Sequence, residues 1–166
     1  YDLLIIGRPT RDTEKSDILT VESALFSTGR PVLISPPEPP KVLGETVLIG
    51  WNRSAQSARA FHAAKALLLD SAKKVRILSV TTGAKNGPSA EEIADCLAWR
   101  GIEAEVREFS PDHRSVGAVL LAEASAIGAD LIVMGGYTQS RLRQILLGNV
   151  TKHVMTNTTL PIFMAH

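Results

Sequence analysis

The chain has 166 residues, of which 45% are hydrophobic and 21% are charged, a composition typical of a soluble globular domain, alone or with a piece of a second one. The net charge of +1 offers no electrostatic attraction to nucleic acid or to an anionic membrane. No apolar run approaches the roughly 20 residues that a transmembrane helix needs. The sequence therefore predicts a protein with neither nucleic acid nor a membrane as a partner.

Two details of the sequence concern the cellular compartment of the protein and the sequence expected before Tyr1. The single cysteine, Cys96, cannot form an internal disulfide, and this favours a reducing cytoplasm. The chain starts at Tyr1 instead of a methionine, and we expect that further sequence precedes it.

The first 35 residues are predicted to form a strand, a helix and a second strand. Residues 2–7 are a short apolar run, and Ile18, Val21 and Leu25 then recur at helical spacing. Gly29 stands where a left-handed helix cap is expected, just before a second apolar run at residues 32–34.

A proline-rich stretch follows this first piece. Residues 35–40 contain four prolines, which exclude regular structure and favour an extended backbone. We interpret residues 36–44 as a linker between a first unit, residues 1–35, and a second unit, residues 45–166.

The second unit alternates strands with helices. Ser54 or Ser57 is expected to cap the first helix, and Ser89 with Glu92 forms a capping box for the second. This alternation predicts an α/β fold with an open five-stranded parallel sheet, helices on both faces and right-handed crossovers. The strands are expected at residues 46–50, 75–80, 104–108, 130–134 and 161–164, and the strict polar–apolar alternation of the third marks it as an edge strand.

The segment from residue 129 to residue 151 is the main candidate for a binding site. A buried strand is followed by Gly135 and Gly136, which are expected to let the backbone turn sharply, and later by an apolar helical pattern interrupted at Gly148. A strand, a glycine turn and a helix start together can present free backbone N–H groups to a phosphate. An ordinary connection between a strand and a helix explains the local pattern equally well.

The two ends of the chain resemble each other. Residues 2–7 are similar to residues 130–135, residues 29–34 are similar to residues 159–164, and the spacing between the two segments is nearly the same. We interpret the first 35 residues as the closing part of a preceding repeat that lacks its first three strands. The alternative is a single domain that begins with a strand–helix–strand unit.

With these motifs in view, residues 45–166 resemble the universal stress protein family, and residues 2–36 resemble its closing element. The phosphate-binding pattern of the family contains three glycines. Two residues of any type separate the first from the second, nine separate the second from the third, and a serine or threonine follows the third directly. On this chain the pattern begins at Gly135 and has its third glycine at Gly148, while Thr138 and Asn149 replace the other two residues. Asn52 stands where the family usually carries an aspartate that contacts the nucleoside.

The resemblance implies a fold like that of the adenine-nucleotide alpha hydrolases, a role in stress response, and a site for ATP or another adenine nucleotide, with Mg²⁺ only when ATP binds. The residues themselves show no catalytic constellation, and the four histidines have no metal-ligand spacing with one another or with Cys96, so neither a catalytic residue nor a metal site is expected. The residues implied in nucleotide binding are Trp51, Asn52, Ser54, Val80, Gly135, Thr138, Arg141, Gly148, Asn149, Val150 and Thr151.

The departures from the family pattern leave two functions open. Thr138 adds a Cβ where glycine would let a phosphate approach closely, and Asn52 lacks the negative charge of an aspartate. Asn149 can still donate a hydrogen bond in place of a hydroxyl group. The chain is therefore expected to be either a nucleotide-binding regulatory domain or a module for assembly and interaction without a nucleotide.

The resemblance also implies association through the last strands, either within the chain or between two copies in a dimer. In a protein with two repeats, residues 32–34 (Val32, Leu33 and Ile34) would pair with residues 162–164 (Ile162, Phe163 and Met164). The strand near residues 3–6 would then expose an apolar edge unless another segment covers it.

Overall fold

The structure is a computed structural model, and it describes residues 1–8, 14–38, 40–80, 87–110, 115–136 and 149–166. The side chains of residues 14–17 and of residue 149 lie outside the description. The strands of the described residues are β1 (Leu4–Gly7), β2 (Val32–Ser35), β3 (Thr46–Trp51), β4 (Lys74–Val80), β5 (Ala104–Phe109), β6 (Leu131–Gly135) and β7 (Ile162–Ala165). The helices are α1 (Glu14–Ser27), α2 (Ala55–Leu67), the short 3₁₀ helix η1 (Leu69–Ser71), α3 (Ala90–Ala98), α4 (Val116–Ile127) and α5 (Asn149–Asn157).

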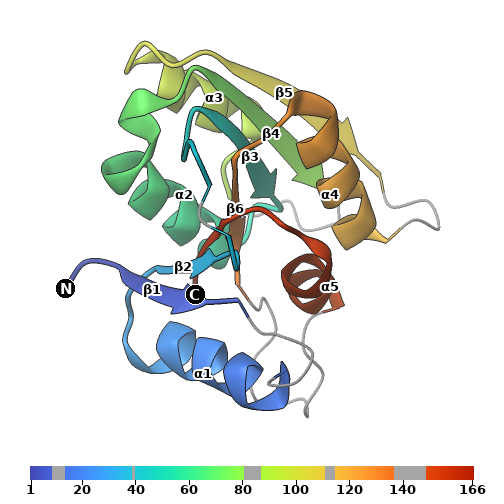
Figure 1. The fold of residues 1–166 in the computed structure, drawn as a ribbon. Helices are drawn as coiled ribbons and strands as arrows, with labels where there is room; N and C mark the ends of the chain where they lie inside the picture. The colour runs from blue at the N-terminus through green and yellow to red at the C-terminus, as the bar shows by residue number, and fades with distance from the viewer. Residues whose placement is uncertain (9–13, 39, 81–86, 111–114, 137–148) are drawn as a thin grey trace.

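The described strands form one sheet in the order β1-β2-β7-β6-β3-β4-β5 (Figure 1). All neighbouring pairs are parallel except β2 and β7, which are antiparallel. The five strands of the second unit are therefore contiguous and parallel, as the sequence predicts, and β5 is an edge strand as expected. The first unit extends this sheet on the side of β7.

Local sequence signals set the ends of the helices. Ser54 caps α2 by accepting a hydrogen bond from the backbone N–H of Ser57. Ser89 and Glu92 form the predicted capping box of α3. Gly128 ends α4 in the left-handed conformation, with φ of 65°, a backbone region that only glycine enters without a steric cost.

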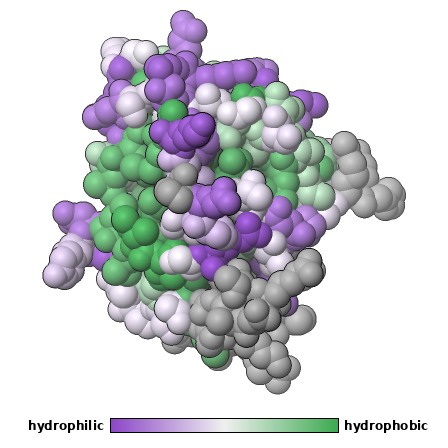
Figure 2. Space-filling model, viewed as in Figure 1, coloured by the Kyte–Doolittle hydropathy of each residue, from purple (hydrophilic) through white to green (hydrophobic). Residues whose placement is uncertain are grey.

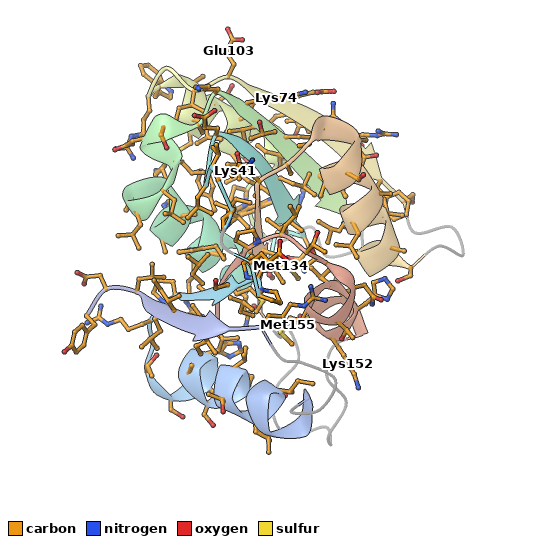
Figure 3. All side chains as sticks on the ribbon, in the orientation of Figure 1. Lys41, Lys74, Glu103, Met134, Lys152 and Met155 are labelled. Carbon is orange, nitrogen blue, oxygen red and sulfur yellow. The ribbon has the colours of Figure 1, made fainter. Side chains whose placement is uncertain are left out.

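Two apolar layers cover the sheet, because side chains of a strand alternate between its faces. One layer lies under α1, α4 and α5, and Figure 3 labels two of its members, Met134 of β6 and Met155 of α5. The other layer lies under α2 and α3 and includes Trp51, Phe61 and Phe163, each fully buried. Both faces are thus covered along the second unit, which explains why its central strands are almost continuously apolar.

The two ends of the chain adopt the same local structure. Leu4 pairs with Val32 in β1–β2 as Ile132 pairs with Ile162 in β6–β7, and both registers end on a glycine, Gly7 or Gly135. The backbone N–H of Leu4 donates to the carbonyl of Pro31, as that of Ile132 donates to Pro161, at 3.0 Å in both cases.

The turn before the last strand of each end is also the same. The backbone N–H of Arg30 donates to the Thr28 hydroxyl oxygen at 3.2 Å, and that of Leu160 donates to the Thr158 hydroxyl oxygen at 3.1 Å. The similarity seen in the sequence is therefore a similarity of backbone hydrogen bonding as well.

The predicted pairing of residues 32–34 with residues 162–164 is confirmed, and it occurs within the chain. Leu33 lies opposite Phe163 at the centre of the antiparallel β2–β7 pair. Since β2 occupies the outer edge of β7, a second copy has no access to that edge in this structure. The pair relates the two ends of the chain by an approximate two-fold axis through the Leu33–Phe163 position.

Candidate functional site

The candidate site lies at the carboxyl edge of the sheet, where β6, β3 and β4 end side by side. The chain runs from β3 to β4 and β5 on one side and returns to β6 and β7 on the other, so the strand order reverses between β6 and β3. Ligands of such sheets bind in the crevice at this reversal. Trp51, Val80 and Gly135 are the last residues of the three strands, so the structure brings these predicted residues to the same edge.

A short polar turn after β3 faces this edge. The Asn52 Oδ1 atom accepts hydrogen bonds from the backbone N–H of Ser54 at 3.2 Å and from its hydroxyl group at 2.7 Å. Arg53, between them, has φ of 59°, which is uncommon for a residue with a side chain and costs about 1–2 kcal/mol. Among the described residues, the Nδ2 amide of Asn52 has no hydrogen-bond partner. This half-buried group can therefore donate to a ligand.

Trp51 contributes its backbone to the edge and its side chain to the core. The indole ring is fully buried, packs edge-on to Phe61 at 6.2 Å between ring centroids, and donates from Nε1 to the Pro88 carbonyl at 3.1 Å. Val80 likewise contributes its backbone to this edge. Its side chain is 6% exposed and packs in the layer under α4. Their side chains thus shape the floor of the site.

The reason for a glycine at the end of β6 differs from the expected one. Neither Gly135 nor Gly136 has a positive φ, so a sharp turn does not require them. A Cβ on Gly135 would lie 2.6 Å from the backbone nitrogen of Ser57, in the first turn of α2. Gly135 is therefore needed because α2 begins directly against β6, a contact between residues far apart in the sequence.

The start of α5 supplies the other side of the site. The described part of this helix begins at Asn149, directly after residues 137–148, which lie outside the described residues. Val150 is half-buried and Thr151 is buried, so both side chains are packed against the protein. Lys152 is exposed on α5, and Figure 3 shows it pointing away from the sheet.

Four of the predicted contacts cannot be placed. Thr138, Arg141 and Gly148 lie outside the described residues, as does the side chain of Asn149. Their roles stay predictions. Among the described residues, no group of histidine, cysteine, aspartate and glutamate side chains is arranged to hold a metal ion.

The largest charge cluster of the described residues lies on the face under α4, away from Asn52. Arg76 donates to Glu105, with an Nη2–Oε2 distance of 2.5 Å, and to Glu123 at 3.2 Å, while Arg107 contacts Glu123 at 2.6 Å. The hydrogen bond to Glu105 raises the pKa of Arg76, and the same bond lowers the pKa of Glu105. These groups satisfy one another, and we assign them to stability.

Sequence reasoning missed two features of this edge. The left-handed backbone of Arg53 has no sequence signal, because the residue is not a glycine. The contact of Gly135 with Ser57 depends on strand order, which local patterns do not specify. A glycine that ends a strand is the one signal that could have suggested a close approach.

The fold and the site define a class of protein: a doubly wound α/β domain whose candidate ligand site lies at the carboxyl edge where the strand order reverses. Residues 85–166 match the model of the Universal stress protein family. This part of the chain is thus similar to the family that the resemblance implies.

The similar proteins agree with this family. The universal stress protein Slr1230 from Synechocystis sp. (strain ATCC 27184 / PCC 6803 / Kazusa) is 25% identical over 98% of this chain, and the chain spans 57% of that relative. A universal stress protein from Archaeoglobus fulgidus DSM 4304 has the same fold, with a TM-score of 0.72 and 22% identity over 99% of this chain and 60% of that one.

Another solved structure is of a universal stress protein in complex with cAMP. It is similar to this chain with a TM-score of 0.54 and 21% identity, over 74% of this chain and 97% of that one. Within the described part of this chain, no helix has the length and apolar character required to cross a bilayer.

Proposed function

We propose that the chain is a regulatory domain of the stress response that binds an adenine nucleotide at the carboxyl edge of β3, β4 and β6. The observation that carries this proposal is the turn after β3, where the Nδ2 amide of Asn52 is a donor without a partner among the described residues. It lies beside the reversal of strand order, where ligands of this fold class bind. The cAMP complex of a similar protein supports a nucleotide as the ligand.

Each part of the site has a role in this proposal. Asn52 donates to an oxygen or nitrogen of the nucleoside, since its Oδ1 atom is already held by Ser54. The described part of α5, from Asn149 to Thr151, is assigned to the phosphates, because the family's phosphate-binding pattern ends at Asn149. Thr138, Arg141 and Gly148 complete the phosphate contacts, and Mg²⁺ accompanies ATP. In this proposal the bound nucleotide acts as a regulatory signal.

The test begins with the purified chain. Heat denaturation followed by mass spectrometry detects a nucleotide that was carried through purification, and calorimetry measures binding of added ATP with Mg²⁺. We expect binding of ATP by the chain and at least tenfold weaker binding by Asn52→Ala, a loss of about 1.4 kcal/mol. Asn157→Ala is the matched control, because among the described residues its amide donates to the His153 carbonyl of its own helix.

The opposite result favours the second function. If no nucleotide is released and ATP gives no heat, the chain is a module for assembly that has lost its ligand. The continuous β2–β7 junction supports that alternative, because it shows that the two ends of the chain already use a strand edge for association.

We also propose that the protein has two repeats. Residues 1–35 are the closing part of one repeat, residues 36–44 are a linker, and residues 45–166 are the complete second repeat. The matching registers of β1–β2 and β6–β7 support this organisation. The lengths of the relatives from Synechocystis and Archaeoglobus, of which this chain spans 57% and 60%, are compatible with it. A reducing cytoplasm is the compartment that we propose for the protein.

A further inference from the structure

We propose that the turn after β3, residues 52–54, selects adenine nucleotides that carry a phosphate ester on the 2′ or 3′ oxygen of the ribose over nucleotides with a free 2′,3′-diol. The inference deepens the proposed function and rests on it, because it concerns the ligand of the same site. Three properties of the turn carry it: the orientation of the Asn52 amide, the support of the backbone, and the charge around the turn.

The orientation of the Asn52 amide is set by a group that can only donate. The backbone N–H of Ser54 donates to Oδ1 at 3.2 Å, and the Ser54 hydroxyl group donates to the same oxygen at 2.7 Å. If the amide were turned over, Nδ2 would face the Ser54 N–H and two donors would oppose each other. Asn52 therefore offers a ligand its Nδ2 group, which has two N–H donors and no acceptor.

The backbone of the turn is supported from one side by residues 87 and 88. The buried Trp51 indole donates to the Pro88 carbonyl at 3.1 Å. Gly87 packs against Arg53 so closely that a Cβ on Gly87 would lie 2.6 Å from the Arg53 carbonyl oxygen. These contacts back Arg53 in its left-handed conformation, so Asn52 is held in place before a ligand binds.

The position of β3 places the Asn52 amide at the ribose. Strands β3 and β6 pair in parallel, and continuing the Gly50–Met134 register by two positions brings Asn52 level with Gly136. Neighbouring strands lie roughly 4.8 Å apart. The proposed site has the 5′-phosphates beyond the end of β6, so the next group of the nucleotide, the ribose, lies at the turn after β3.

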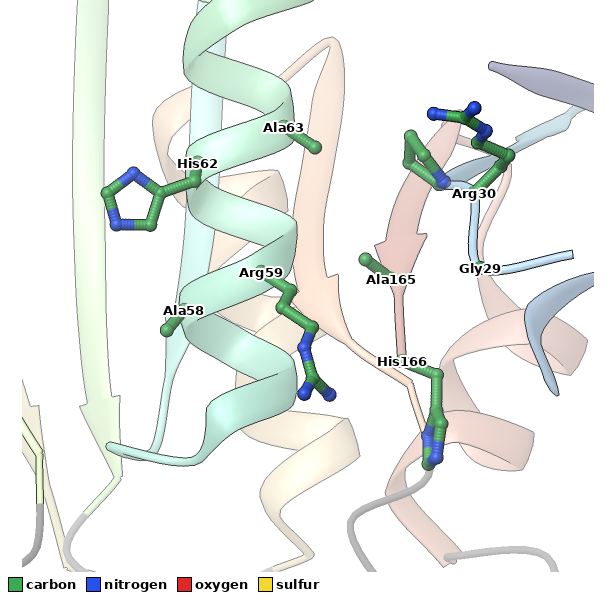
Figure 4. A pocket seen from close by; sticks show the side chains of 9 residues that line it. Gly29, Arg30, Ala58, Arg59, His62, Ala63, Ala165 and His166 are labelled. Carbon is green, nitrogen blue, oxygen red and sulfur yellow. The ribbon is translucent and has the colours of Figure 1, made fainter. Parts of the chain in front are cut away.

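The charge around the turn favours an anion. Between residues 46 and 69 the chain has three basic residues and no acidic one; the basic residues are Arg53, Arg59 and Lys65. Figure 4 shows the Arg59 guanidinium directed toward the end of α2 that begins at the carboxyl edge, in a groove that His166 also lines. Figure 2 shows mainly apolar side chains on the surface where α2 and β1 lie in Figure 1, and that face suits a phosphate less.

A phosphate ester matches this turn better than a diol does. A hydrogen bond from an amide to a charged oxygen is about twice as strong as one between neutral groups. A diol brings two protons that need acceptors, and the acceptor of Asn52 is already occupied by Ser54. A carboxylate in this position would have the opposite preference, because it would accept the protons of the diol and repel a phosphate. Arg53 also interacts with the exposed Glu91 of α3, so Asn52 and not Arg53 is the residue to test.

The test compares nucleotides with the same number of phosphates. Calorimetry of the purified chain measures the binding of ADP, which has a free diol, and of adenosine 3′,5′-bisphosphate and adenosine 2′,5′-bisphosphate, all without Mg²⁺. We expect one of the two bisphosphates to bind roughly tenfold more tightly than ADP. NMR gives a readout apart from affinity: the Asn52 side-chain amide protons and the phosphorus resonance of the ribose-edge phosphate should both shift on binding.

Asn52→Asp is the diagnostic variant. It keeps an oxygen for both hydrogen bonds from Ser54 and puts a negatively charged oxygen in the place of Nδ2. The preference should reverse, so that ADP binds more tightly than either bisphosphate. Asn157→Asp makes the same change of charge at an exposed position in the last turn of α5 and should leave the preference unchanged.

The outcomes separate this inference from the proposed function. ADP that binds as tightly as both bisphosphates, or more tightly, overturns the selection and leaves the nucleotide site standing. A preference that changes equally in Asn52→Asp and Asn157→Asp also overturns it, because the cause would then be the net charge of the protein. Binding of none of the three nucleotides overturns the selection and the proposed function together. The preference of the unsubstituted chain decides the matter even if Asn52→Asp fails to fold.

Discussion

The units β1–α1–β2 and β6–α5–β7 have the same strand registers and the same turn before the last strand, but they differ in what surrounds them. The second unit has β3 at its edge and α2 on its face, whereas the first has neither among the described residues. Ile5 and Val133, at equivalent positions, are consequently 68% and 0% exposed. The difference shows that backbone pairing alone does not bury a strand, and that burial depends on neighbours from elsewhere in the chain.

The two aspartates provide the largest expected contrast. Asp130→Ala removes the acceptor of three backbone N–H groups and should lower the free energy of unfolding by about 3–4 kcal/mol. Asp2→Ala should change it by less than about 0.5 kcal/mol, because its ion pair is exposed. Urea denaturation of both variants measures the contrast. A similar loss of unfolding free energy in both variants would mean that Asp2 already accepts hydrogen bonds from backbone N–H groups in solution.

The two glycines come next. Gly135→Ala should destabilise the chain by about 2–3 kcal/mol, because the Cβ would lie 2.6 Å from the Ser57 nitrogen and α2 would have to move. Gly7→Ala should be neutral or stabilise by up to about 1 kcal/mol, since it restricts the unfolded chain without a clash. Thermal unfolding of the two variants, compared with the unsubstituted chain, measures these changes in stability. A substantial loss of stability caused by Gly7→Ala in the 166-residue chain would contradict the prediction that the position has open space.

The two apolar side chains should differ somewhat less. Val133→Ala removes methyl groups from a fully buried position and should cost about 2 kcal/mol. Ile5→Ala should cost less than about 0.5 kcal/mol, because most of the side chain is already in water. Chemical denaturation resolves this difference, and equal costs would show that Ile5 is covered in solution.

The smallest expected contrast is between two substitutions of Arg8. Its guanidinium group donates to the Thr156 carbonyl in the last turn of α5, where a positive charge is favoured, and partial burial lowers its pKa. Arg8→Ala should cost about 1 kcal/mol in thermal unfolding. Arg8→Lys, which keeps the charge but not the planar donor group, should cost less than Arg8→Ala. Equal losses for the two variants would assign the effect to the hydrogen-bond geometry alone.

Much of the fold follows from local patterns in the sequence. The capping box at Ser89 and Glu92 and the left-handed Gly29 are confirmed, because both depend on residues close to the helix end. The pairing of residues 32–34 with residues 162–164 was accessible because the family resemblance implies association through the last strands and the two ends of the chain repeat.

The candidate site was less accessible to sequence reasoning. Asn52 and Gly135 lie at the expected edge, yet their surroundings come from distant parts of the chain. Ser57 explains Gly135, and it belongs to a helix that lies 78 positions earlier. The phosphate contacts expected of Thr138, Arg141 and Gly148 stay predictions.

The sequence by itself determined the alternation of strands and helices, the helix caps and the repeated motif, because each depends on residues close together in the chain. Only the tertiary structure decided which strands are neighbours, and with them the surroundings of each repeated residue. Gly7 and Gly135 end their strands at equivalent positions of the two registers, and Asp2 and Asp130 precede those strands in similar sequence contexts. They differ physically because β3 and α2 pack against one end of the chain and not against the other among the described residues.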